Sequence, residues 1–261
     1  MSLVASRPIE TSDASVERKC ESLPLDSVTE NAVRSSVGRL FVVIPAYNES
    51  SRIKTVIDNL RRSGVRDIVV VDDGSADDTA NLAAAEDVWV LRHIVNRGQG
   101  AALQTGIDFA ISNQADLIVT FDADGQHRGE DLLKMIQPIV DGRADVTLGS
   151  RFLGNAENVP PLRRLILKAG VVLTRLTSGL PLTDTHNGYR VMTSNAATRL
   201  RMFEDGMAHA SEFLDRLAAS KLRWTEVPVT IRYTEGTLEK GQRNSAAFRI
   251  LFRIFISKVT R

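Results

Sequence analysis

Short apolar runs alternate with segments of helical spacing along the middle of the chain. Three runs are rich in β-branched residues and have the length of buried strands: Leu40–Pro45, Ile68–Asp73 and Leu117–Asp124. Two more runs predict further strands, Val88–His93 and Asp145–Ser150. Segments with apolar positions at helical spacing lie between them, at 49–62, 77–85 and 100–112. This alternation predicts an α/β domain with a mostly parallel central sheet, right-handed crossovers and flanking helices.

The two ends of the chain differ from this middle part. Residues 1–38 contain eight Ser and no aromatic residue, and they show no sustained period, so we expect a flexible tail. A short helix over Asp26–Arg34 that docks on the domain is the alternative. We therefore divide the chain into the tail, one domain at 39–235, and a C-terminal part at 236–261 that consists of a flexible loop and an amphipathic helix.

Charge and composition limit the classes of partner. The chain has 261 residues, with 33 Lys and Arg against 32 Asp and Glu, and a net charge of +1 does not favour nucleic-acid binding. Cys20 is the single cysteine, which excludes an internal disulfide and fits a reducing compartment. The sequence contains no apolar run long enough to span a bilayer and begins without the pattern of a signal peptide. We expect a cytoplasmic protein.

The last segment qualifies this expectation. Ala246–Arg261 surrounds its basic residues with a broad apolar arc and has no carboxylate, which is typical of a helix that lies on anionic lipid. A helix that packs on the core or forms a dimer is the alternative. The predicted location is therefore peripheral, on the inner face of the membrane, and a second copy of the chain or a membrane protein stays open as a partner.

Acidic and polar residues follow the predicted strands where these end. Tyr47–Glu49 follows the first strand, Asp72–Ser75 ends the second, and Asp122–His127 ends the third of the long runs. Each group alone is explained by a turn or a helix N-cap. The carboxyl ends of parallel strands meet at one edge of a sheet, however, and converging carboxylates repel each other unless a cation joins them.

The third group has the oxygen ligands of a hard cation. Asp122 and Asp124 are separated only by the small residue Ala123, and the amide of Gln126 follows after a glycine. Such ligands select Mg²⁺ or Mn²⁺, and Mg²⁺ commonly binds carboxylates together with substrate phosphates. His127 is a fourth ligand, a residue that supports the ligands without touching the metal, or a solvated side chain.

Five motifs in fixed order carry a resemblance to a known family: Ile44–Glu49, Val70–Ser75, Asn96–Ala101, Asp122–Gln126 and Gly149–Arg151. Over about 40–233 the chain resembles family 2 glycosyltransferases, and within them most closely the dolichyl- and polyprenyl-phosphate sugar transferases. The resemblance implies a GT-A fold, inverting transfer from a nucleotide diphosphate sugar, and a divalent metal.

The resemblance also implies roles for single residues. The nucleotide pocket would be lined by Pro45, Tyr47, Glu49 and Asp73, with Asp73 at the base or ribose. The sugar-nucleotide would lie at Asp122 and Ala123, and the metal would be held by Asp122, Asp124 and Gln126. Phosphates of donor or acceptor would meet Arg151, Arg164, Lys240 and Arg243. The reacting centre would contain Asp122, Arg151 and Asp184, with Arg190 nearby. Glu212 matches a helix carboxylate of the family.

Two acceptors fit this interpretation. The favoured one is a polyprenyl phosphate at the cytoplasmic membrane face, and the other is a hydroxyl of a glycan or a lipid-linked saccharide. A hydroxyl requires proton removal, and Asp184 would then be the base, whereas a phosphate is already anionic. A sugar nucleotidyltransferase would need a Gly-rich basic loop after the first strand, and 45–49 does not supply one. The complete metal-ligand set disfavours a non-catalytic sensor subunit.

Overall fold

The central sheet of the molecule has seven strands. The structure is a computed structural model that describes residues 38–154, 156–157, 171, 175, 179–185 and 187–232. The strands are β1 (Leu40–Ala46), β2 (Asp67–Asp72), β3 (Trp89–Arg92), β4 (Leu117–Thr120), β5 (Val146–Ser150), β7 (Arg190–Thr193) and β8 (Trp224–Pro228). Their order is β3-β2-β1-β4-β7-β5-β8. β7 is antiparallel to both of its neighbours, and the other pairs are parallel.

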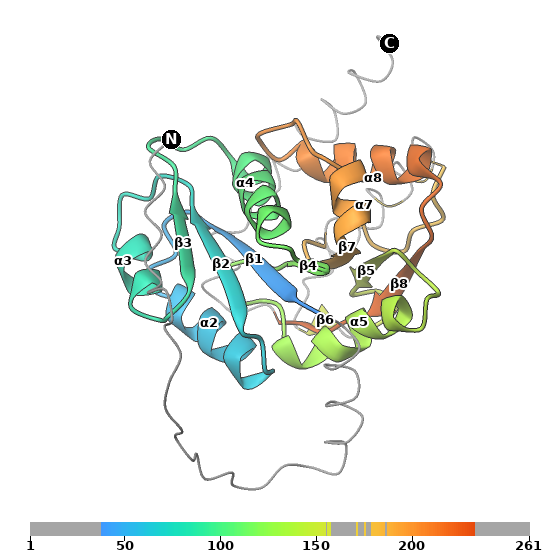
Figure 1. Cartoon of the computed structure of the whole chain (residues 1–261). Coiled ribbons are helices and arrows are strands. Elements are labelled where there is room, and N and C mark those ends of the chain that lie inside the picture. Colours follow the sequence, from blue (N-terminus) through green and yellow to red (C-terminus); the bar gives the residue numbers. More distant parts are fainter. Residues whose placement is uncertain are drawn as a thin grey trace, which may run out of the picture.

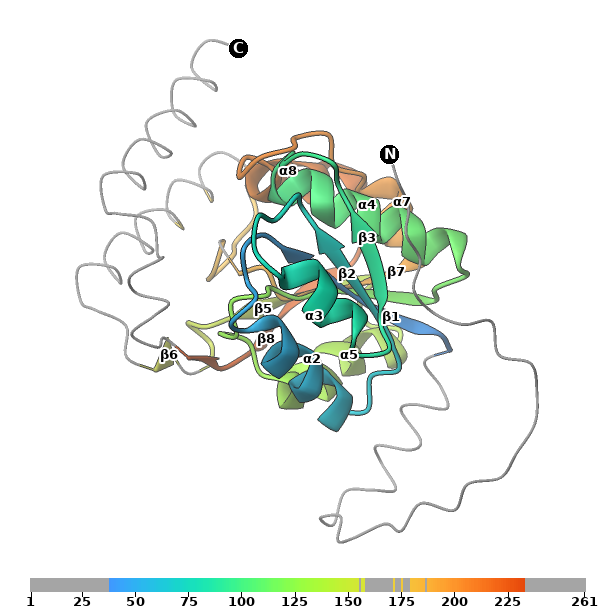
Figure 2. The same cartoon turned by 90° about the vertical axis from the view of Figure 1, so that its left-hand side faces the viewer.

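Helices cover both faces of this sheet (Figures 1 and 2). One face packs against α2 (Ile53–Arg62), α3 (Thr79–Ala84) and α5 (Leu132–Val140). The other face packs against α4 (Gln99–Ser112), α7 (Ser194–Arg199) and α8 (His209–Ser220). A short 3-10 helix, Gly129–Asp131, precedes α5, and a two-stranded sheet pairs β6 (Ala156–Glu157) with β9 (Ile231–Arg232). The result is a three-layer α/β/α domain.

The apolar pattern explains why these segments adopt these elements. In α2 the buried residues are Ile53, Val56, Ile57 and Leu60, which lie on one face because three and four residues make about one turn. β1 and β2 are buried on both faces along most of their length, as expected of parallel strands between two helix layers. The sequence prediction of a layered α/β fold is confirmed.

Several predicted features lie outside the described residues. These are residues 1–37 of the tail and the whole C-terminal part, including the amphipathic helix at 246–261, so the division of the chain remains a prediction. Among the described residues, no helix is both long and apolar enough to cross a membrane. The antiparallel strand β7 was not predicted, because the polar sequence 184–190 that leads into it reads as a turn.

Strand order brings the polar loops together. β1 lies between β2 and β4, so the residues that follow these three strands share one edge of the sheet. β4 and β5 are both antiparallel to β7 and are therefore parallel to each other, which places Asp122 and Arg151 at the same edge. Ligands of open α/β sheets bind at this carboxyl edge.

Candidate active site

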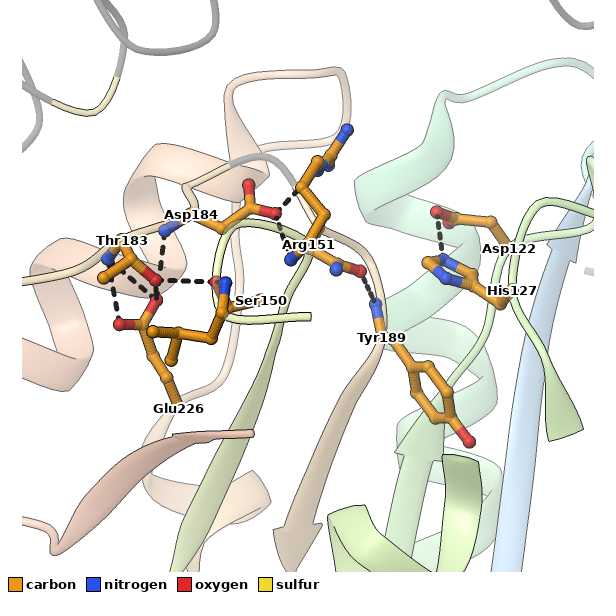
Figure 3. Close-up of polar contacts among 10 residues, drawn as sticks. Asp122, His127, Ser150, Arg151, Thr183, Asp184, Tyr189 and Glu226 are labelled. Carbon is orange, nitrogen blue, oxygen red and sulfur yellow. Dashed lines mark hydrogen bonds and ion pairs between the residues drawn. The ribbon is translucent and has the colours of Figure 1, made fainter. Parts of the chain in front are cut away.

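Asp122 follows strand β4 in the sequence, and each of its two carboxylate oxygens has a hydrogen-bond partner. Gln99 Nε2 donates to Oδ1 at 3.0 Å, and His127 Nε2 lies 3.0 Å from Oδ2 (Figure 3). Burial raises the pKa of Asp122, but the hydrogen bond with His127 and the electrostatic effects of His127 and Arg190 outweigh it, so the pKa lies below its usual value. Asp122 is therefore a carboxylate at neutral pH.

Asp124 has the opposite electrostatic environment. Burial and the negative charge of Asp122 raise its pKa, and Glu49 adds to this effect. Its Oδ1 accepts the backbone N–H of Gln126 at 3.0 Å. Among the described residues no cluster of three His, Cys, Asp or Glu side chains is arranged to hold a metal. The donor set nevertheless fits a divalent cation, because such an ion would relieve the repulsion between Asp122 and Asp124.

The loops after β1 and β2 are joined by side-chain contacts. Asn48 adopts a left-handed backbone conformation with φ of 54°, and its Oδ1 accepts the backbone N–H of Ala76 at 2.9 Å. The backbone N–H of Glu49 donates to Thr79 Oγ1 at 2.9 Å. Glu49 is also ion-paired with Arg52 at 2.9 Å. Pro45 is buried within β1, whereas Tyr47 beyond it is 48% exposed, and their place in a nucleotide pocket stays a prediction.

Asp73, which follows β2, binds the neighbouring loop. Its Oδ1 accepts the backbone N–H of Arg97 at 2.9 Å and lies 2.7 Å from Nδ1 of His93, and its Oδ2 accepts the backbone N–H of Gly98 at 2.7 Å. An ionised carboxylate only accepts, so His93 Nδ1 carries the hydrogen. Asp73 thus shapes the 93–98 loop, and its predicted contact with the base or ribose stays a prediction.

A buried ion pair follows β5. Arg151 Nε donates to Asp184 Oδ2 at 2.6 Å, and the Arg151 backbone N–H donates to the same oxygen at 3.1 Å. Glu226 of β8 accepts the backbone N–H groups of Thr183 and Asp184 at 2.9 and 3.0 Å. Figure 3 shows this pair together with the Asp122–His127 pair, with Tyr189 between them. Both pairs therefore lie at the carboxyl edge of the sheet, and the role of Asp122, Arg151 and Asp184 as the reacting centre stays a prediction.

Comparison with known proteins agrees with this geometry. The family model described as glycosyl transferase family 2 matches residues 41–206. The chain is a family 2 glycosyltransferase. Its relatives include the UDP-N-acetylglucosamine–dolichyl-phosphate N-acetylglucosaminyltransferase of Methanococcus voltae, 31% identical over 84% of this chain and 96% of the relative. The undecaprenyl-phosphate mannosyltransferase of Micrococcus luteus is 34% identical over 74% of this chain and 83% of the relative.

Solved structures show that this glycosyltransferase has the predicted GT-A fold. The crystal structure of glucosyl-3-phosphoglycerate synthase from Mycobacterium tuberculosis superposes with a TM-score of 0.64 over 87% of this chain and 84% of that chain, at 21% identity. Another crystal structure of that synthase, in complex with Mn²⁺, UDP and phosphoglyceric acid, gives a TM-score of 0.61 at 20% identity, over 81% and 77% of the two chains. At this identity the likeness concerns the fold alone.

Two further residues act on the acidic centre of the glycosyltransferase: Arg190, which the family resemblance had placed near the reacting centre, and His209, which the sequence did not indicate. Arg190 of β7 is buried, and its guanidinium carbon lies 4.1 Å from the ring centre of Phe213. Burial lowers its pKa to about 10, which leaves it charged at neutral pH, and Asp122 opposes this shift. Burial and the charge of Arg190 lower the pKa of His209 to about 4, so His209 is neutral.

The remaining predicted residues of the glycosyltransferase have mixed outcomes. Ala123 is buried beside the acidic pair. Glu212 lies in α8, where its carboxylate accepts the backbone N–H groups of Phe203 and Glu204 and pairs with Arg216 at 2.9 Å. It thus holds the preceding loop. The phosphate contacts predicted for three cations fall outside the described residues: Arg164, Lys240 and Arg243.

Proposed function

We propose that this glycosyltransferase moves a sugar from a nucleotide diphosphate sugar to a polyprenyl phosphate. Two of its relatives are named for transfer to dolichyl and undecaprenyl phosphate, and the matches span 84% and 74% of this chain. The observation that carries the proposal is the joint presence of an acidic centre, Asp122 and Asp124, and a buried cation, Arg151, at one edge of the sheet.

The acidic centre accounts for the donor. Asp122, Asp124 and Gln126 would hold Mg²⁺ or Mn²⁺, which when bound offsets negative charge on the departing nucleotide diphosphate. The raised pKa of Asp124 supports this assignment, since its carboxylate lies close to a second negative charge. Tyr47, exposed beyond β1, provides a ring face at the nucleotide side of the site.

The contact of Asp184 with Arg151 supports a phosphate acceptor. This carboxylate is already engaged by Arg151, and a phosphate acceptor needs no base because its oxygen is anionic at neutral pH. In an inverting displacement this oxygen forms a bond to the anomeric carbon, and the bond from that carbon to the diphosphate breaks with its electron pair on the leaving oxygen. Arg151 is suited to bind the incoming phosphate, because a planar guanidinium matches phosphate oxygens.

The same proposal covers location. A polyprenyl phosphate is embedded in a membrane, so the enzyme must reach the lipid surface, and we assign this contact to the basic apolar segment 246–261 at the cytoplasmic face. Deletion of 246–261 should release the protein from vesicles that contain anionic lipid. Binding that persists after the deletion would place the contact elsewhere.

A ligand-dependent thermal shift tests the donor site. The full chain is heated with Mn²⁺ and, in turn, UDP-, GDP- and dTDP-linked sugars, with Asp124→Ala as the matched variant. A donor held at 100 times its dissociation constant stabilises a protein by about 2.7 kcal/mol, which is readily detected. We expect one nucleotide to act only with metal and only in the wild type. Equal shifts in Asp124→Ala, or full transfer activity of that variant, would contradict the metal role.

A further inference from the structure

We propose that Gln99 and His127 are positioning residues that lock the carboxylate of Asp122 in one orientation. Each donates to a different oxygen of this carboxylate at 3.0 Å. The donors come from separate elements, since Gln99 is the first residue of α4 and His127 lies in the loop after β4. Rotation of the carboxylate about its Cβ–Cγ bond would break both contacts.

The two donors are themselves held in place. The His127 ring is buried, and its centre lies 5.2 Å from those of both Phe121 and Tyr189. Gln99 follows Gly98, which has a φ of 108° and whose backbone N–H donates to Asp73 Oδ2 at 2.7 Å. The carboxylate after β2 therefore fixes the start of α4, and this start brings the Gln99 amide to Asp122.

The third side of the carboxylate is closed by the segment that leads into β7. A Cβ atom on Gly188 would lie 2.6 Å from Asp122 Oδ1, so any residue larger than glycine at this position would displace the carboxylate. The Gly188 carbonyl accepts a hydrogen bond from Thr120 Oγ1 at 2.6 Å, which ties this segment to β4. The carboxylate is thus bounded by α4, by the loop after β4 and by the segment before β7.

This arrangement has a consequence for metal binding, and the inference here rests on the proposed metal site. A ligand that is already oriented loses little freedom when the cation binds, and the residues that orient it strengthen binding without touching the ion. Removal of such a supporting hydrogen bond typically weakens metal affinity by about 10–100-fold. Gln99 and His127 should therefore control the affinity of the site.

Direct Mn²⁺ binding tests the inference without reference to activity. Free Mn²⁺ is measured by electron paramagnetic resonance during titration of the full chain in the presence of UDP. The variants are Gln99→Leu and His127→Phe, which remove the donors and keep the side-chain bulk. The matched control is Gln104→Leu in the same helix, where Gln104 Nε2 bonds Asp108 at 2.8 Å and its Oε1 accepts the backbone N–H of Met202.

We expect the dissociation constant for Mn²⁺ to rise about 10–100-fold in Gln99→Leu and His127→Phe and to stay unchanged in Gln104→Leu. The melting temperature without metal should be similar in Gln99→Leu and the control, which separates positioning from a loss of folding. If His127→Phe does not fold, Gln99→Leu decides, because Gln99 is partly exposed at a helix end.

The outcomes separate this inference from the proposed function. Wild-type protein that binds Mn²⁺ while both variants bind it equally well would overturn the positioning role and leave the metal site standing. Wild-type protein that binds no Mn²⁺ with UDP present would instead contradict the metal site itself, and the positioning role with it.

Discussion

The buried pair of Arg151 and Asp184 makes a quantitative prediction for Asp184→Ala. The two side chains are 8% and 1% exposed, and Nε and Oδ2 are 2.6 Å apart. Removal of one partner from a buried ion pair typically costs about 3–5 kcal/mol, because the other charge stays away from water. For a domain of about 150–250 residues each kcal/mol lowers the melting temperature by about 2–4 °C, so we expect a decrease of about 6–20 °C.

Urea unfolding provides the assay, with the midpoint compared at constant slope. The matched control is Asp141→Ala, which removes the partner of Arg143 at 2.7 Å, where the side chains are 63% and 35% exposed. An exposed pair contributes less than about 1 kcal/mol. The double variant Arg151→Met with Asp184→Leu should recover most of the loss, because it leaves no buried charge.

Unfolding of Asp184→Ala at the same urea concentration as Asp141→Ala would contradict the stabilising role of the buried Arg151–Asp184 pair. Such a result would mean that Arg151 reaches water or another partner when Asp184 is removed. A double variant as unstable as Asp184→Ala would also contradict the argument from buried charge.

Three further predictions concern the surroundings of the site. In Gly188→Ala the new Cβ would displace the Asp122 carboxylate, so turnover should fall about 100-fold or more, and wild-type turnover would refute this. The pKa of His209 is about 4 in the folded state, below the ordinary 6.5, so the unfolded chain binds the proton first and stability is lost as pH falls from 6.5 to 4. The variant His209→Gln should flatten this dependence of stability on pH. An equal slope of stability against pH in the variant and the wild type would contradict the assignment. Glu212→Ala should speed amide exchange at Phe203 and Glu204, and unchanged protection would count against the contact.

The fold was predictable because its signals are local. The apolar runs of β1, β2 and β4 and the helical spacing of α2 depend only on residues a few positions apart, so the sequence pattern shows them directly. The antiparallel strand β7 was not predictable, because its place between β4 and β5 depends on contacts with strands that are distant in sequence.

The candidate site divides in the same way. Asp122, Asp124 and Asp73 follow strands, and the shared edge of parallel strands brings them together without further information. The contacts made by Gln99, His127 and Glu226 could not be predicted, since they depend on side-chain directions across 23, 5 and more than 40 positions. The sequence signals for them were the place of His127 directly after the acidic loop and the place of Gln99 within the motif Asn96–Ala101.

Transfer of labelled sugar to undecaprenyl phosphate, compared with transfer to undecaprenol, distinguishes a phosphate acceptor from a hydroxyl acceptor. Both acceptors have the same polyprenyl chain, and they differ in the phosphate that Arg151 is proposed to bind. With Mn²⁺ and the donor identified by thermal shift, we predict product from the phosphate alone, and none from Asp124→Ala. Transfer to the alcohol at an equal rate, or transfer without any divalent cation, would contradict the proposed metal-dependent transfer to a phosphate.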